Sequence, residues 1–125
     1  MKSNGYPAAG MARDGAAMIL TFVKLKALAG KRKELRQTLE SIAAQTAKET
    51  GCLDSGFYQR TEDDTDFLLI GAWESRTALD DHLQSNRFSV LMGAKSLLSR
   101  PPEVVIHTVA ASAVLTPPNR GTFTG

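Results

Sequence analysis

Two side chains in this sequence have types suited to a reaction on a small aromatic molecule, His82 and Trp73. A neutral imidazole can take a proton from a phenol or an activated carbon near neutral pH. An indole can stack on a planar ring and donate one hydrogen bond through its N–H group. Each residue also has a structural interpretation, because a tryptophan usually packs in a core and a helical histidine can bond to Asp81 or to water. Both are therefore candidates for a site.

The other chemically reactive residue types favour structural roles. His107 shares one face of its expected strand with Val105 and Val109, which is typical of a histidine at an interface. Cys52 is the only cysteine, so no internal disulfide can form, and we expect a small buried side chain in a reducing compartment. The sequence has no Cys/His cluster for zinc and no glycine-rich nucleotide motif. We expect no metal and no bound cofactor.

Length and composition indicate one small domain. The chain has 125 residues, 42% of them hydrophobic, and a formal net charge of +2. This charge is too small to indicate binding to nucleic acid or to a membrane surface, and no stretch reaches the roughly 20 apolar residues of a membrane span. We expect a cytoplasmic protein with a domain over residues 17–111, a disordered tail over 1–16, and a tail or dimer arm over 112–125.

Hydrophobic periodicity divides the middle of the chain into strands and helices. Gly51 is expected to end the first helix in a left-handed conformation, and Ser75 to cap a second helical region that Pro101 stops. The expected elements are strands at 18–27, 52–60, 66–74 and 103–111, a helix at 31–49, and a helical region between Ser75 and Pro101 interrupted at Ser85 and Asn86. This order predicts an α+β fold of the ferredoxin-like, split βαβ type with an antiparallel sheet.

The third expected strand is apolar on both faces. Phe67, Leu69, Gly71 and Trp73 alternate with Leu68, Ile70 and Ala72. One set can face the helices, and no remaining element can cover the other. We therefore expect a homodimer in which two sheets face each other.

Charged side chains gather in two loops. The first loop carries Lys24, Lys26, Lys31, Arg32 and Lys33, and the turn at 62–66 is acidic. Both are expected to be solvated surface. RNA-recognition modules share this order of elements but stack bases on aromatic residues of the third strand. The outward set here is aliphatic, so RNA is not an expected partner.

Three motifs follow one another along the chain. They are Glu49-Thr50-Gly51-Cys52-Leu53, Ala72-Trp73-Glu74-Ser75-Arg76 with Ala78-Leu79, and Asp81-His82-Leu83 with Ser85-Asn86-Arg87-Phe88. In order and spacing they resemble the E-P-G-C-L, W-E-S-x-x-A-L and H-L-x-S-x-H-F signatures of the antibiotic biosynthesis monooxygenase family. The resemblance covers residues 18–111 and implies the dimeric α+β barrel fold.

The resemblance implies a cofactor-independent monooxygenase acting on a small aromatic substrate, quinol-like or polyketide-like. His82 matches the helical histidine position of the family, which implies the catalytic base. The implied pocket between sheet and helices is lined by Val23, Trp73, His82, Phe88, Leu91 and Met92. Haem-degrading relatives carry an asparagine where this chain has Val23 or Thr21, so haem degradation is not implied. The alternative is a non-catalytic small-molecule binding or accessory domain of the same fold.

Overall fold

The computed structural model describes residues 18–118. The expected N-terminal tail over 1–16 lies outside the described residues, as does the end of the expected C-terminal arm. Residues 112–118 are described, adopt no helix or strand, and are largely exposed. The elements in chain order are β1 (Met18–Lys26), α1 (Arg32–Thr46), β2 (Cys52–Gln59), β3 (Asp66–Trp73), α2 (Arg76–Leu83), α3 (Asn86–Met92) and β4 (Glu103–Val109).

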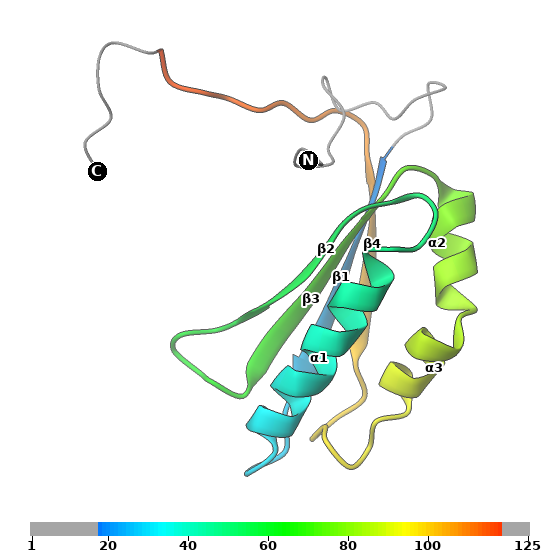
Figure 1. The fold of residues 1–125 in the computed structure, drawn as a ribbon. Coiled ribbons are helices and arrows are strands. Elements are labelled where there is room, and N and C mark those ends of the chain that lie inside the picture. The colour runs from blue at the N-terminus through cyan, green and yellow to red at the C-terminus, as the bar shows by residue number, and fades with distance from the viewer. Residues whose placement is uncertain (1–17, 119–125) are drawn as a thin grey trace.

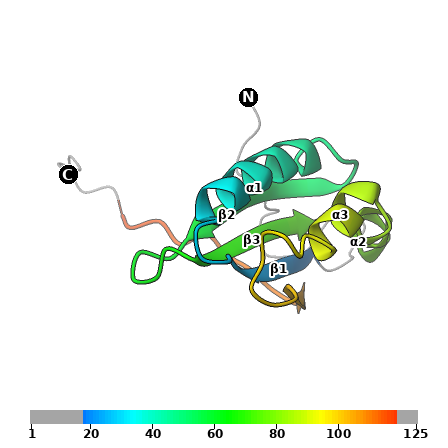
Figure 2. The same ribbon diagram turned by 90° about the horizontal axis from the view of Figure 1, so that it is seen from below.

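The four strands form one antiparallel sheet in the order β2-β3-β1-β4 (Figure 1). Each central strand leads through a helical crossover to an edge strand, β1 through α1 to β2 and β3 through α2 and α3 to β4. All three helices lie on the same side of the sheet, as the view from below shows (Figure 2). This arrangement confirms the predicted ferredoxin-like α+β fold. No helix within residues 18–118 is long and apolar enough to cross a membrane.

The helical region between β3 and β4 divides because it contains two N-caps. The Ser75 side chain accepts a hydrogen bond from the Ala78 backbone N–H, and the Ser85 side chain accepts one from the Phe88 N–H, both at 3.1 Å. Each serine satisfies an N–H group that the first turn of a helix leaves without an intrahelical partner. The interruption expected at Ser85 is therefore the start of α3.

Two expected helix ends differ from the structure. Helix α1 ends at Thr46, so the prediction that Gly51 caps it is wrong. Gly51 does adopt the left-handed conformation, with φ of 81°, but in the turn that enters β2. A Cβ atom there would lie 2.5 Å from Ala78 Cβ, which adds a steric reason for glycine. Helix α3 ends at Met92, and Leu98 instead forms a β-bridge with Ala27.

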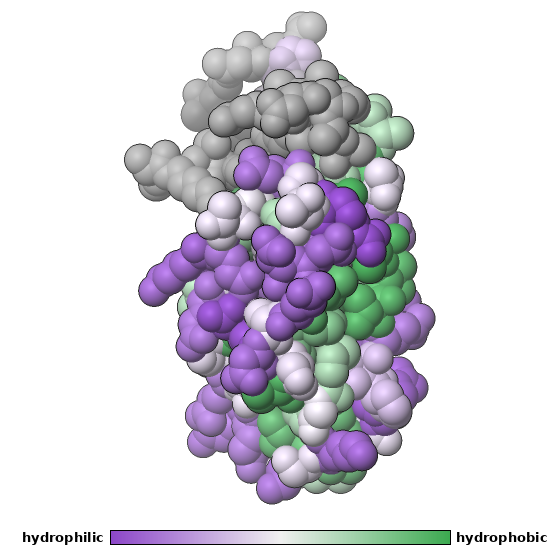
Figure 3. Space-filling model, turned by 90° about the vertical axis from the view of Figure 1, so that its right-hand side faces the viewer, coloured by the Kyte–Doolittle hydropathy of each residue, from purple (hydrophilic) through white to green (hydrophobic). Residues whose placement is uncertain are grey.

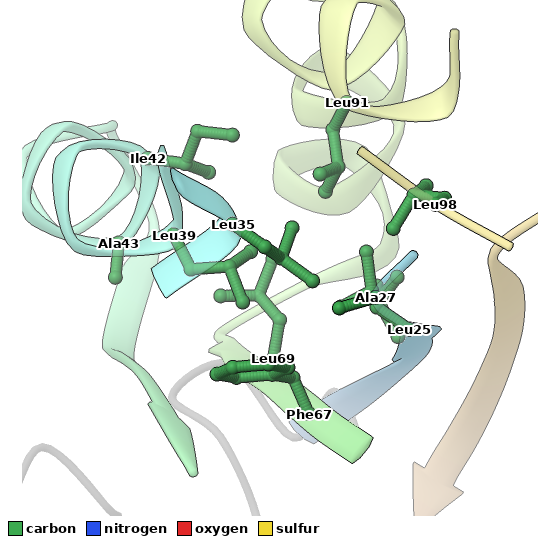
Figure 4. Close-up of a cluster of buried hydrophobic side chains, with 11 residues drawn as sticks. Leu25, Ala27, Leu35, Leu39, Ile42, Ala43, Phe67, Leu69, Leu91 and Leu98 are labelled. Atoms are coloured by element: carbon green, nitrogen blue, oxygen red, sulfur yellow. The ribbon is translucent and has the colours of Figure 1, made fainter. Parts of the chain in front are cut away.

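The main core lies between α1 and the sheet (Figure 4). Leu35 and Leu39, one turn apart on α1, are fully buried against the side chains of β1 and β3. Leu91 of α3 closes this core from the other side. Burying a leucine of this kind stabilises the fold by about 1.5–3 kcal/mol. The core therefore holds both helices against the sheet and fixes the space between them.

The opposite face of the sheet carries apolar side chains that no helix covers. Figure 3, in which the helices lie on the left and the sheet on the right, shows hydrophobic residues gathered on the sheet side. Leu68 and Ile70 are partly exposed there, and Tyr58 is 66% exposed. Ala72 is already buried within the chain, so a partner is not needed to cover it. Phe22 packs edge-on against His107 at 5.0 Å on this face, which is therefore less aliphatic than expected from β3 alone.

The basic first loop and the acidic turn pair with each other. Lys26 bridges Asp63 and Asp66, and Arg32 approaches Asp64 at 3.3 Å. The Lys26 ammonium, with help from Thr65, holds the pKa of Asp63 well below its usual range. Asp63 and then Asp66 raise the pKa of Lys26 above 10.5. The basic loop and the acidic turn therefore form ion pairs with each other within the chain.

We expect Asp63→Asn to lower the melting temperature modestly at neutral pH and not at strongly acid pH. The folded-state pKa of Asp63 is depressed, so its stabilisation is present above the ordinary value of 3.8 and is lost as pH falls below it. The raised pKa of Lys26 adds a second loss as pH rises above 10.5. Thermal melts against pH measure this. Glu62→Gln, at a side chain that is 78% exposed, is the control. If Asp63→Asn lowered the melting temperature as much at acid pH as at neutral pH, the stabilising role of the Asp63 charge would be wrong.

Candidate active site

A small cavity lies between the helix-facing side of the sheet and the helices. Its volume is about 20 Å³. A cavity needs roughly 10–15 Å³ to hold one water molecule, so it has room for little more than that. The residues around it come from β1, β3, α1, α2 and α3, and include Val23, Thr46, Gly71, Trp73, His82 and Phe88.

Strand alternation places Trp73 in the cavity wall. It is the last residue of β3, its side chain is fully buried, and it shares the helix-facing side with Gly71. A Cβ atom on Gly71 would lie 2.9 Å from Trp73 Nε1 and 2.8 Å from Thr21 Oγ1. Any side chain at position 71 would therefore push the indole N–H edge out of place. Glycine is needed because the indole lies directly against the strand.

His82 lies in the last turn of α2 and is buried, with only 7% of its surface exposed. Its Nδ1 atom is 3.1 Å from both carboxylate oxygens of Glu49. An ionised carboxylate only accepts hydrogen bonds, so Nδ1 is the ring nitrogen that donates to Glu49. In a neutral imidazole this leaves Nε2 as the nitrogen that can accept a proton, the arrangement that a general base requires.

Arg87 holds Glu49 in place from α3. Its Nη1 group donates to Glu49 Oε2, and its Nε group donates to Gln45 Oε1 at 3.0 Å. Gln45 lies in the last turn of α1 and Glu49 in the segment that follows it, and one guanidinium binds both. Glu49 therefore serves two partners, the imidazole of His82 and the guanidinium of Arg87.

Aromatic rings surround the imidazole. The Trp73 and His82 ring centroids are 4.7 Å apart with a 34° tilt, and the Phe88 ring meets His82 edge-on at 5.4 Å. These ring contacts add to the hydrogen bonding with Glu49 in orienting His82. The imidazole therefore contacts two aromatic rings and one carboxylate.

Two buried polar atoms in the cavity wall have no hydrogen-bond partner within the described residues. They are Trp73 Nε1 and Thr46 Oγ1. A buried polar group without a partner costs about 1–3 kcal/mol. The indole N–H can only donate, whereas the hydroxyl can donate or accept. A bound molecule with an acceptor oxygen would satisfy both.

The structure brings four of the six predicted site residues together and separates two. Val23, Trp73, His82 and Phe88 line the cavity. Leu91 is buried in the main core, and Met92 packs against that core. Neither lines the cavity, because α3 turns both toward α1 and the sheet.

Glu49, Thr46 and Arg87 were not predicted as site residues. Glu49 and Arg87 lie in the motifs quoted above, which indicate the fold. Thr46 lies on the buried face of α1, where its hydroxyl gives no periodic signal. Within residues 18–118, no three His, Cys, Asp or Glu side chains are placed to hold a metal ion.

Most of the chain segments that form the cavity walls are similar in sequence to a known protein family. A family model described as antibiotic biosynthesis monooxygenase matches residues 18–93, from β1 through α3, which is more than half of the chain. The chain belongs to the antibiotic biosynthesis monooxygenase family. The match includes Trp73, His82 and Glu49, so the candidate site lies within the family domain.

The chain also resembles individual proteins in sequence and in structure. An uncharacterized protein of Synechocystis is 28% identical over 92 residues, which cover 73% of this chain and 63% of that protein. The chain thus spans less than two thirds of that relative. A conserved protein from Methanosarcina mazei superimposes with a TM-score of 0.66 at 27% identity, covering 73% of this chain and 91% of that one.

A third protein, from Deinococcus radiodurans and named for the antibiotic biosynthesis monooxygenase family, has a TM-score of 0.71 at 22% identity. The superposition covers 78% of this chain and 98% of that one. Likeness at this identity shows the shared fold, and it agrees with the strand order described above.

Proposed function

We propose that the chain is a cytoplasmic, cofactor-independent monooxygenase acting on a small aromatic substrate, quinol-like or polyketide-like. The observation that carries this proposal is the His82–Glu49 hydrogen bond beside Trp73, in a cavity with two buried polar atoms that lack protein partners. A base oriented by a carboxylate next to an indole suits proton removal from a phenol or an activated CH group. Membership of the family supports the same class of reaction.

In the proposed reaction, His82 Nε2 takes the proton. The Trp73 N–H and the Thr46 hydroxyl donate to the substrate oxygen on which negative charge gathers, and thereby stabilise the anion. The anion passes an electron to dioxygen, and the two radicals combine as a peroxide anion on the substrate carbon. This anion takes the proton back from His82 and becomes the hydroperoxide. Loss of water leaves a carbonyl. A CH₂ group and O₂ thus give C=O and H₂O without an added reductant.

We also propose that two copies pair sheet to sheet. The uncovered face of the sheet carries Leu68, Ile70, Phe22 and the exposed Tyr58. An apolar sheet face of this kind is typical of an interface rather than of a solvated surface. The described residues offer no further helix or strand to cover it. A second copy presents the same apolar face and can do so by two-fold symmetry.

Oxygen uptake tests the proposed activity directly. Purified protein is incubated with a panel of quinols and anthrones, and we expect uptake above the spontaneous rate for at least one of them. Heavy-isotope oxygen should label the new carbonyl of the product. Heat-denatured protein is the control. Uptake equal to the spontaneous rate for every compound would refute the assignment.

The small volume of the cavity favours a second candidate, a non-catalytic binding domain. A space of about 20 Å³ does not admit an aromatic ring unless the helices move. A binding domain would still change the fluorescence of Trp73, the only tryptophan, when a ligand enters. Ligand-dependent fluorescence without oxygen uptake would therefore support this candidate.

A further inference from the structure

The cavity has room for little more than one water molecule, so a larger ligand can enter only where the surrounding elements give way. Outside it, a groove of about 750 Å³ runs between α1 and α3. The groove and the cavity are lined by consecutive residues of the same helices. In α1, Gln45 lines the groove and Thr46 lines the cavity. In α3, Arg87 lines the groove and Phe88 lines the cavity. Neighbouring side chains of α1 and α3 therefore lie between the groove and the cavity.

Arg87 is one of these side chains and links α3 to α1. Its guanidinium, from α3, bonds to Gln45 and Glu49, both on the α1 side. Its side chain is 28% exposed and that of Glu49 is 21% exposed, so water reaches the pair from the groove. Helix α3 has only seven residues and is attached through turns at both ends. Breaking the Arg87 contacts would let this short helix move away from α1.

The groove lining has a distinct chemistry. The Arg87 charge is balanced by Glu49, and the Glu34 charge by Lys31 at 3.6 Å. The remaining polar lining is uncharged and consists of the amides and hydroxyls of Gln37, Thr38, Ser41, Gln45, Ser85 and Asn86. Such a surface offers hydrogen bonds to hydroxyl groups and no unbalanced charge for an ion.

We propose that the α1–α3 groove is the entrance to the cavity and the subsite for an uncharged, hydroxyl-bearing part of the ligand, and that Arg87 closes it. The inference rests on the proposed function only in taking the cavity as the site where a ligand binds. The reacting ring enters beside Trp73, and the polar part of the same molecule stays in the groove. Trp73 Nε1 and Thr46 Oγ1 gain their missing partners at the inner end.

Collisional quenching of Trp73 tests the entrance, because this sole tryptophan is fully buried and lines the cavity. The quencher is 2,2,2-trichloroethanol, which is neutral and carries a hydroxyl. We expect Arg87→Ala to raise its quenching constant about fivefold, which corresponds to losing about 1 kcal/mol of closing interaction. Arg87→Lys keeps the charge beside Glu49 but loses the Gln45 bond, so its constant should be intermediate.

Arg76→Ala is the matched control, since it removes an arginine whose exposed ion pair with Asp80 lies within α2 and away from the groove. Its quenching constant should equal that of the wild type. The emission maximum and melting temperature of each variant separate opening of the groove from unfolding. An unchanged constant in both folded Arg87 variants would overturn the entrance assignment.

Trichloroacetate, an anion of similar size, tests the subsite. It should quench wild-type Trp73 several-fold less than trichloroethanol does, after correction for free tryptophan. Equal or stronger quenching by the anion would overturn the uncharged subsite. Neither quenching measurement depends on turnover. The oxygen-uptake test can therefore refute the proposed reaction without refuting the proposed entrance, and the quenching tests can refute the entrance without refuting the reaction.

Discussion

His82→Ala should lower turnover by about 10²–10⁴-fold, the usual contribution of a general base. The imidazole is the ring placed against Trp73, and Glu49 fixes its proton on Nδ1. Alanine leaves the cavity without a group that can take the substrate proton. Steady-state oxygen uptake with the substrate found in the panel measures the loss. Because His82 is buried, a thermal melt must show that the variant is folded.

Three variants separate the base from its surroundings. Asp81→Ala changes the exposed neighbour on the same helix and should leave turnover unchanged. Trp73→Phe keeps a ring but loses the N–H and stacking area, so it should raise KM more than it lowers kcat. Glu49→Gln removes the carboxylate that accepts from the imidazole and should lower kcat. Wild-type turnover in folded His82→Ala would mean that the substrate loses its proton to water or to another group.

Ile70→Lys should raise the dissociation constant of the dimer by at least about 100-fold, because an uncompensated buried charge costs about 3–5 kcal/mol. Ile70 lies in the central strand β3, between Gly56 of β2 and Phe22 of β1. Two-fold symmetry brings both copies of the lysine into one interface, where like charges also repel. Sedimentation over a range of concentrations measures the association.

Val90→Lys is the matched control for this prediction. Val90 is 58% exposed on α3, on the helical side of the molecule, so the same substitution leaves the sheet face intact. Sedimentation should show Val90→Lys associating like the wild type. If wild-type protein sediments as a monomer at micromolar concentration, the proposed sheet-to-sheet pairing is wrong. If folded Ile70→Lys remains as dimeric as the wild type, the interface lies elsewhere.

The strands could be predicted closely because they depend on local alternation. Met18–Lys26 and Asp66–Trp73 each lie within one residue of the predicted ends. The helix ends were less predictable, since the end of α1 at Thr46 depends on the turn that brings Gly51 against Ala78. A contact between residues so far apart in sequence leaves no periodic trace.

The order of elements, the two sides of β3 and the presence of His82 and Trp73 on neighbouring elements could all be read from the sequence. Periodicity and capping residues carry this information, because side-chain direction in a strand or helix follows from residue number. Which groups meet became clear from the three-dimensional packing. It joined Glu49 to His82 and Arg87, left Trp73 Nε1 and Thr46 Oγ1 without partners, and placed Leu91 in the core. These outcomes depend on how α1, α2 and α3 pack on one sheet, and packing is set by the volumes of side chains that are distant in the chain.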